Sequence, residues 1–362
     1  MAAQVPRHPS PLKSGAGAFL WCLGLLLISL WLSTAVGAVT LPLREILAGL
    51  LPVPLRGGVE LSSTTYAILY QIRLPRTVLV ALVGAALAGS GAAYQGLFRN
   101  PLADPYLLGV ASGGGLGAVI AMTWQTQGAS DYARDVPLPS LVLIPLAAFA
   151  GALLTVVLVY RLGSVRGTAL RLMDSHTSRI ILAGVAIGAF ATAMTTFVML
   201  RLQGDMYRPV AWMLGGFTIG GWGPVLASLP FIVVGLGALA ALGRVLNVMQ
   251  FGEDQAQHMG LNVTRARAAV IVGASLVTAA AVAFSGIIGF VGLAVPHAVR
   301  LMWTHDYRKL VPLSILLGAG GLLLADVLAR TLVAPQEIPL GVVTAALGAP
   351  FFLYQLRRSG LG

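Results

Sequence analysis

Charge is the scarcest property of this sequence. Only 10% of its 362 residues are charged, against about 25% in a typical soluble domain. Because 57% of the residues are hydrophobic, one aqueous core could not bury so much apolar surface, and a soluble globular protein is excluded. The single cysteine, Cys22, excludes an intrachain disulfide and a cysteine-based metal site.

Nucleotide-binding and catalytic signatures are also missing. The two lysines, Lys13 and Lys309, do not follow a glycine, so the sequence holds no GxxxxGKS or GxxxxGKT phosphate loop. No group of His, Asp and Glu has the spacing of a catalytic or metal site. We therefore expect no enzyme activity, no bound cofactor and no metal site in this chain.

Apolar runs of spanning length recur along the chain, each near the roughly 20 residues that a helix needs to cross a bilayer. Mean hydropathy is +0.87, and 44 glycines and 20 prolines suit helices that pack closely in lipid. We predict an all-α polytopic membrane protein with a single domain of residues 15–362, preceded by a flexible cytoplasmic tail of residues 1–14. The ten predicted spans are at about 17–37, 77–98, 106–125, 139–160, 179–200, 224–246, 267–285, 288–303, 310–332 and 340–356.

Two of these spans have alternative interpretations. Basic residues before the first run and small residues after it resemble a cleaved signal peptide, but the run is long enough to span. We interpret it as a retained helix. The eighth run is short and is interrupted by glycine and proline, and the total is even only if it is a true span.

The net charge is +11, and the basic residues lie between the apolar runs. This pattern fits loop topology and contact with anionic lipid better than nucleic-acid binding. With the N-terminus inside, fifteen Lys and Arg fall on the inner side and eight on the outer side, which predicts that both termini are cytoplasmic. Arg73 and Arg76 then lie outside, where the positive-inside rule gives no reason for them.

The segment that begins with Asn100 and Pro101 carries the signals of a helix start. Asp104 is a good N-cap, and Pro105 suits the first helical position, so we predict that the third helix begins there. We expect Gly109 and the glycines that follow to form a small-residue surface that packs closely on a neighbouring helix. These glycines are Gly113, Gly114, Gly115 and Gly117.

A polar segment, residues 247–267, separates the sixth and seventh spans on the predicted inner side. Glu253 and Asp254 suit the first turn of a helix, where they favour the helix dipole, and Gly260 suits the position after its last turn. The segment predicts a short helix on the cytoplasmic face. From the residues alone, an amphipathic connector and a docking helix for a cytoplasmic partner both remain open.

Asp326 is the clearest carboxylate inside an apolar run. Arg330 lies four residues later on the same helix face, so an ion pair between the two is geometrically available. An intramembrane charge suggests a functional site, but a structural role is the simpler interpretation, and we favour it. In that role Asp326 neutralises Arg330 or caps the end of a neighbouring helix.

Several long motifs together resemble one family of proteins. The stretch RLPRTVLVALVGAALAGSGAAYQGLFRNPLADPYLLGVASG is similar to a segment of the permease subunits of ABC importers for iron–siderophore complexes, haem and vitamin B12. The resemblance continues in the family's order through AWMLGGF, FGEDQAQHMGLN, FSGIIGFVGLAVPHAVR, LLLADVLAR and EIPLGVVTAALGAPFFLYQL. It covers roughly residues 66–357.

The resemblance implies a type II importer permease fold in a prokaryotic cytoplasmic membrane, with ten helices and a homodimer around the pathway. It also implies an external substrate-binding protein and two cytoplasmic ATPase subunits, which would hold ATP and Mg²⁺. Arg73, Arg76 and Arg330 match family positions that meet acidic residues of the binding protein. The stretch that matches the ATPase-docking region contains Gly252, Glu253, Ala256, Gly260 and Leu261, and Pro296, His297 and Arg300 of the VPHAVR segment lie on the same inner face.

The cargo is the part of the function that the sequence constrains least. We rank ferric siderophore first, then vitamin B12, then haem, and no histidine lies in the outer half to favour haem. An ion-gradient-driven secondary transporter is the alternative class, although we find no internal repeat to support it. A membrane channel or scaffold is a third alternative.

Overall fold

The computed structural model describes residues 15–37, 39–51, 61–127, 140–164, 176–201, 206–216 and 220–358, and the predicted tail of residues 1–14 lies outside this part. All of its regular structure is helical. The helices are α1 (Gly15–Ala35), α2 (Leu43–Leu50), α3 (Ser63–Tyr66), the π-helix η3 (Ala67–Arg73), α4 (Leu74–Phe98), the 3-10 helix η4 (Pro105–Leu108), α5 (Val110–Gln127), α6 (Ser140–Ser164), α7 (His176–Leu200), α8 (Tyr207–Met213), α9 (Trp222–Ala241), α10 (Gly243–Met249), α11 (Glu253–His258), α12 (Val263–Ser285), α13 (Val291–Met302), α14 (Tyr307–Thr331) and α15 (Leu340–Arg358).

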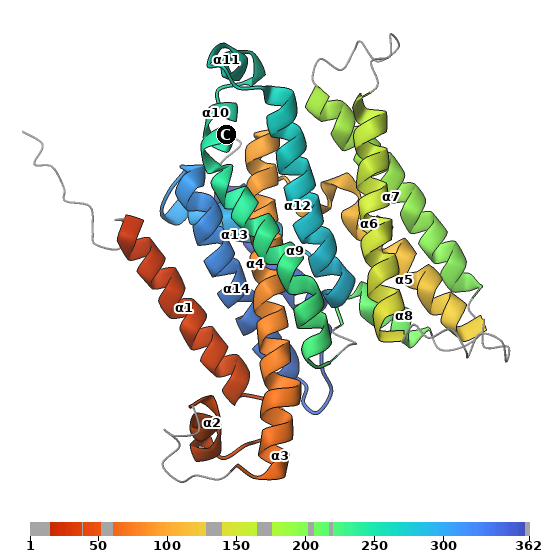
Figure 1. Ribbon diagram of the computed structural model, residues 1–362, viewed down its shortest axis with the longest axis vertical. Coiled ribbons are helices and arrows are strands. Elements are labelled where there is room, and N and C mark those ends of the chain that lie inside the picture. The colour runs from red at the N-terminus through yellow and green to blue at the C-terminus, as the bar shows by residue number, and fades with distance from the viewer. Residues whose placement is uncertain are drawn as a thin grey trace, which may run out of the picture.

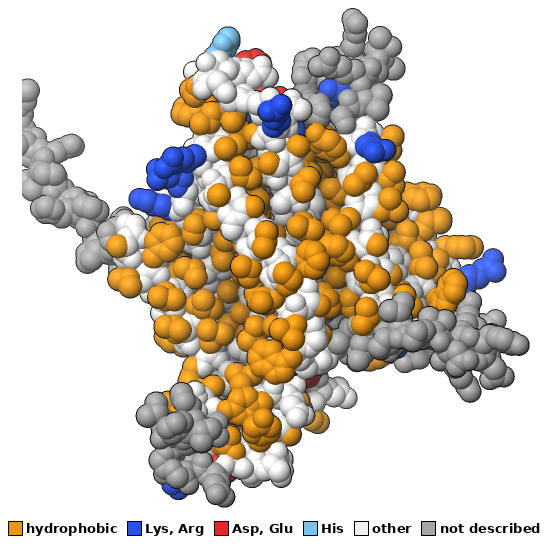
Figure 2. Space-filling view, in the orientation of Figure 1, with side chains coloured by type: hydrophobic (Ala, Val, Ile, Leu, Met, Phe, Trp, Pro, Cys, Tyr) orange, Lys and Arg blue, Asp and Glu red, His pale blue; other side chains and the backbone are white. Residues whose placement is uncertain are grey.

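Each of the ten predicted spans includes most of one long or apolar helix: α1, α4, α5, α6, α7, α9, α12, α13, α14 and α15. The span predicted at 106–125 also includes η4, and the span predicted at 224–246 extends beyond the end of α9 into α10. Seven of the described helices are long and apolar enough to cross a membrane, and α13 and α15 contribute shorter apolar stretches. Figure 2 shows hydrophobic side chains over most of one face between the two ends, with Lys and Arg mainly toward the end that carries α11. The helices therefore cross the bilayer roughly along the long axis in Figure 1.

The helix α4 lies at the centre of the larger group of helices, and it is buried on all sides over most of its length. It packs most extensively on α14 and also contacts α12, α13 and α9, while α1 packs on the outer side of α14 (Figure 1). Glycines permit these close approaches, because a Cβ on Gly91 would lie only 1.9 Å from the carbonyl oxygen of Gly292.

A second group consists of α5, α6 and α7, which pack on one another and join the first group mainly through α12 (Figure 1). The predicted small-residue surface is confirmed at Gly113 and Gly117. A Cβ on either would lie within 2.5 Å of a backbone carbonyl oxygen of α6. Gly115 differs, because its nearest neighbour for such an atom is 3.8 Å away.

The helix that carries the second predicted span begins well before residue 77, since it runs without interruption from Ser63 through Pro75 to Phe98. The π-turn before Pro75 explains this continuation. In a π-helix the acceptor for residue 75 is the carbonyl of residue 70, and proline has no N–H to give it. The indole Nε1 of Trp222 donates to that Tyr70 carbonyl instead, at 2.9 Å.

The predicted helix start at Asp104 is correct only for one turn. The Asp104 carboxylate accepts a hydrogen bond from the Tyr106 N–H at 2.8 Å, as an N-cap does. The turn that follows is a 3-10 helix, and Gly109 ends it with φ of 75°. Gly109 therefore separates η4 from α5 rather than lying on α5. Asn100 forms a turn of its own, in which its side-chain oxygen accepts from the Leu102 N–H.

The eighth predicted span is shorter than a membrane. With 12 residues, α13 measures about 18 Å, against roughly 30 Å for the hydrocarbon core. A short segment without regular structure precedes it, bounded by Gly286 and Phe290, which both have positive φ.

Candidate functional sites at the two ends of the bundle

Arg73 lies at the end of the bundle opposite α11, and it is buried. Its guanidinium donates to the carbonyls of Thr34 at 3.0 Å, Ala35 at 2.7 Å and Val39. The last carbonyls of a helix have no partner within that helix, so Arg73 caps the C-terminus of α1. Its side chain is also packed against Gly37, where a Cβ would lie 2.9 Å from a guanidinium nitrogen.

Arg330 of α14 reaches the same helix end from the other side. It donates to the carbonyls of Ser33 and Val36, both at 3.1 Å, and to the Ser33 hydroxyl at 3.2 Å. The predicted pair with Asp326 is confirmed, since Arg330 Nε lies 2.9 Å from Asp326 Oδ2. Its Nε is also 3.4 Å from the Asp326 carbonyl. Arg73 and Arg330 together attach α1 to α4 and α14.

Arg76 connects the buried and exposed parts of this network. On its buried side, Nε and Nη2 donate to Asp326 Oδ1 at 3.1 and 2.9 Å. On its outer side, Nη1 donates to Glu337 Oε2 at 2.8 Å. Asp326 is 0% exposed, Arg76 22% and Glu337 48%, so the network runs from the core to the surface within three side chains.

These contacts divide the three arginines that the sequence predicts for docking. Arg73 and Arg330 are buried and hold internal partners, whereas Arg76 reaches the surface and lines a small outer pocket of about 110 Å³ with Pro75 and Gly221. The docking role itself stays a prediction for all three. Sequence reasoning missed Glu337, which lies in the quoted EIPLGVV motif but becomes a partner of Arg76 only through the fold.

At the other end of the bundle, the segment predicted as a helix folds as one. Glu253 begins α11, and Gly252 and Gly260 bound it with φ of 101° and 84°, conformations that glycine adopts at little cost. Ala256, in the middle of α11, is fully buried, and its carbonyl accepts a hydrogen bond from the Leu261 N–H at 3.0 Å. The remaining residues of α11 after Glu253 are exposed, and the helix projects from the end of the bundle (Figure 1).

Two side-chain contacts fasten this projection to the bundle. Glu253 forms an ion pair with Arg267 of α12. Gln250, just before α11, donates to the Gly96 carbonyl of α4 at 2.9 Å. Beside these anchors, Phe251 and Met259 are 63% and 54% exposed. A helix that is anchored to the bundle and has exposed apolar residues beside both of its ends is suited to contact with another protein rather than to catalysis.

The VPHAVR residues belong to α13 and are not part of the projecting helix α11. Pro296 is buried in α13, and Arg300 donates to the Gln95 side-chain oxygen of α4 at 2.9 Å. Gln95 in turn donates to the Leu293 carbonyl at 3.2 Å. Arg300 Nη1 and His297 Nδ1 are buried and have no hydrogen-bond partner among the described residues. Gln95, which sequence reasoning missed, thus joins α4 to two different turns of α13, at Leu293 and at Arg300.

Near the same end, Asp306 caps the N-terminus of α14. Its carboxylate accepts from the Asn247 amide at 2.6 Å and from the Arg308 N–H at 2.9 Å. These hydrogen bonds, the Asn247 amide first, hold the pKa of Asp306 below its usual value. The contact joins α10, and through it α11, to α14.

The described residues contain no group of three or more His, Cys, Asp or Glu that could hold a metal ion.

Comparison with known proteins gives a consistent result along the chain. A model of the FecCD transport family matches residues 25–358. The uncharacterized ABC transporter permease protein YvrB of Bacillus subtilis (strain 168) is 39% identical, over 95% of this chain and 94% of that protein. The cobalamin import system permease protein BtuC of Halobacterium salinarum is 44% identical, over 84% and 76%. The vitamin B12 import system permease protein BtuC of Escherichia coli O139:H28 is 41% identical, over 80% and 84%.

The fold is similar to that of a solved structure of an inward-facing ABC transporter assigned to the metal-chelate type. The TM-score is 0.75 with 27% sequence identity, over 95% of this chain and 99% of the other. The similarity therefore extends over the whole bundle and both of its ends.

Proposed function

The chain belongs to the FecCD transport family and is a permease subunit of an ABC importer, and on that premise we propose that its cargo is a corrinoid of the vitamin B12 class. The observation that carries this proposal is the 44% and 41% identity to two permeases named for cobalamin or vitamin B12 import, over 84% and 80% of this chain. These two come from different organisms, and each similarity includes most of the transmembrane bundle.

This proposal replaces the order expected from the sequence, which placed ferric siderophore first. The quoted motifs identify the family but are shared by permeases for several cargoes, so they do not separate a siderophore from a corrinoid. The similarity to the two permeases named for cobalamin or vitamin B12 import extends well beyond these motifs, over 84% and 80% of this chain, and this supports a corrinoid. Membership of an ABC importer family also favours ATP-driven import over the ion-gradient alternative.

Transport in a defined system tests the cargo. The permease would be reconstituted in liposomes with its ATPase and binding protein, and uptake of radiolabelled cyanocobalamin, a ferric siderophore and haem would be compared. We expect ATP-dependent accumulation of cyanocobalamin well above the other two. Accumulation of the siderophore, with none of cyanocobalamin, would contradict the proposal while leaving the importer assignment intact.

An ABC importer permease works with ATPase subunits and a binding protein, and we propose a place for each on this chain. The α11 end has most of the predicted inner-side basic residues, so it would face the cytoplasm. There α11, with Phe251 and Met259 exposed beside its anchors, would dock one ATPase subunit. The complete importer would contain two copies of this chain and two ATPase subunits.

The opposite end would face the binding protein, and Arg76 is the arginine placed to meet it. Asp326 holds the buried side of its guanidinium, whereas Nη1 points outward to the exposed Glu337. A carboxylate of the binding protein would take the position of Glu337, so that docking exchanges an internal ion pair for an intermolecular one. Such charge pairs set encounter rate and register more than raw affinity.

A further inference from the structure

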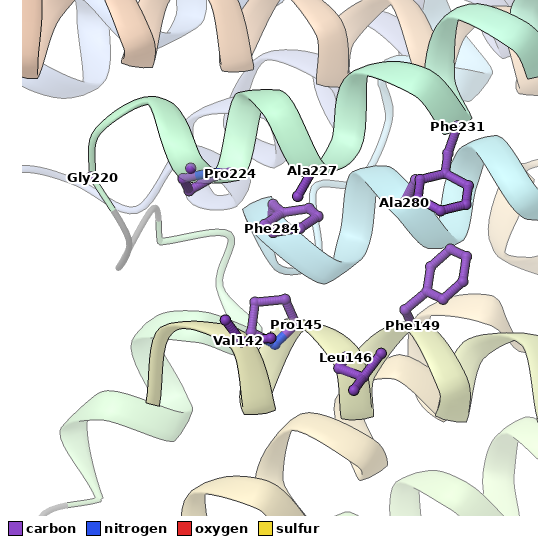
Figure 3. A pocket seen from close by; sticks show the side chains of 11 residues that line it. Val142, Pro145, Leu146, Phe149, Gly220, Pro224, Ala227, Phe231, Ala280 and Phe284 are labelled. Carbon is purple, nitrogen blue, oxygen red and sulfur yellow. The ribbon is translucent and has the colours of Figure 1, made fainter. Parts of the chain in front are cut away.

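An apolar cavity of about 530 Å³ lies between α6, α9 and α12. Figure 3 shows its walls, with Leu146 and Phe149 of α6 on one side, Ala227 and Phe231 of α9 on the other, and Phe284 of α12 between them. The lining residues are all hydrocarbon side chains, prolines or glycines. Both α6 and α9 pack on α12, so α12 forms the floor and the opposite side opens away from the core.

The cavity is confined to one half of the membrane. The rings of Phe149 and Phe231 lie 5.4 Å apart and close its deep end (Figure 3). Phe231 is nine residues after Trp222, the first residue of α9, which places it about 14 Å along the helix. The hydrocarbon core is roughly 30 Å thick. Trp222, a residue type enriched at membrane interfaces, marks the shallow end.

The described residues do not fill this space, and its apolar lining offers water no hydrogen-bond partners. An apolar cavity of about 150 Å³ stays dry and binds small hydrocarbons, and this cavity is larger and equally apolar. Its walls continue into an exposed apolar surface, since Leu146 is 54% exposed and Leu226, beside Ala227, is 66% exposed. At this depth the surrounding solvent is lipid hydrocarbon, and an unfilled space would leave the lining without contacts.

We infer that the cavity binds one acyl chain of a membrane phospholipid, drawn from the leaflet at the Trp222 end of α9. The chain would lie between α6 and α9 with its terminus toward Phe149 and Phe231. It would thereby fill the junction between the two groups of helices, which are otherwise joined mainly through α12.

Photocrosslinking in a bilayer tests this assignment. The full chain would be placed in nanodiscs of phosphatidylethanolamine and phosphatidylglycerol that contain a trace of phosphatidylethanolamine with a diazirine midway along one acyl chain. After irradiation, labelled peptides would be mapped by mass spectrometry. We expect labelling of the wild type to concentrate on the lining positions of α6 and α9. Even labelling of all exposed positions on α9, or an unlabelled cavity covered by another protein surface, would overturn the inference.

Two variants that fill the cavity and one matched control strengthen the test. A Cβ on Gly223, which lines the cavity, and a Cβ on Gly237, which lies on α9 outside it, would both meet nothing within 4 Å. We expect Gly223→Leu and Ala227→Phe to reduce labelling of α6 at least fivefold and Gly237→Leu to leave it unchanged. Undiminished labelling in both filled variants would also overturn the inference. Unchanged labelling elsewhere on the surface would show that a variant is folded.

Discussion

Replacement of Asp326 by asparagine should destabilise the bundle more than any other single removal of charge at this end. The carboxylate is 0% exposed, and it contacts Arg76 Nη2 and Arg330 Nε, both at 2.9 Å. Asparagine keeps the shape but leaves both guanidinium groups without their shared anion. Removing one partner of a buried pair costs about 3–5 kcal/mol, because the remaining charge stays desolvated.

The two arginines should not contribute equally to that loss. Arg76 is 22% exposed and keeps Glu337 at 2.8 Å, whereas Arg330 is 6% exposed and keeps only the Ser33 hydroxyl and backbone carbonyls. Most of the loss should therefore come from Arg330. It should show as loosening of α1, whose C-terminal carbonyls Arg330 caps.

Reversible unfolding in mixed micelles of detergent and SDS, followed by circular dichroism, measures the change. We expect a free energy of unfolding lower by about 3–5 kcal/mol for Asp326→Asn and by no more than about 1 kcal/mol for Glu337→Gln, an exposed pair. A double variant, Asp326→Leu with Arg330→Met, should recover part of the loss, since replacing both charges removes the unpaired ion. An Asp326→Asn protein as stable as Glu337→Gln would refute the reasoning.

Three further predictions concern docking, packing and pH. Glu337→Gln should speed association with the binding protein and lower the Kd of that complex by a few fold, because the internal pair of Arg76 with Glu337, worth about 0.2–1 kcal/mol, no longer competes with the binding protein for Arg76. Arg76→Gln should weaken docking, and in that background Glu337→Gln should no longer lower the Kd. Association kinetics at several salt concentrations would measure both, and an unaltered Kd in Arg76→Gln would remove Arg76 from the interface. Gly91→Ala should lower the free energy of unfolding by about 1–3 kcal/mol through overpacking, since its Cβ would lie 1.9 Å from a carbonyl oxygen. In the control variant Gly24→Ala the added Cβ meets nothing within 4 Å, and stability should not change. Equal unfolding free energies of the two variants would contradict the close contact. The lowered pKa of Asp306 means that its contribution to stability is complete above the usual carboxylate pKa and is lost as pH falls through the lowered value. The drop in thermal stability between neutral and acidic pH should therefore be smaller in Asp306→Asn than in the wild type, and parallel profiles would show that the cap contributes nothing.

The candidate sites show where sequence reasoning succeeds. The Asp326–Arg330 pair and the boundaries of α11 depend on residues within one or two helical turns, and both were predicted correctly. The same is true of the glycine surface at Gly113 and Gly117. Each of these features is set by helix periodicity or by a backbone conformation that one residue type favours. Local information is sufficient in such cases.

The sequence by itself located the long apolar helices of the bundle, because apolar runs of spanning length leave lipid as their only stable solvent. Only the tertiary structure decided what the arginines of the second helix do. Arg73 finds its carbonyls 34 to 39 residues back, in the last residues of α1 and just after that helix, and Arg76 finds Asp326 250 residues ahead. The Tyr70 carbonyl, for which Pro75 has no N–H, likewise finds its donor far along the chain, in the indole of Trp222. Partners so distant in sequence leave no periodic pattern, since they meet only when α1, α4, α9 and α14 have packed together.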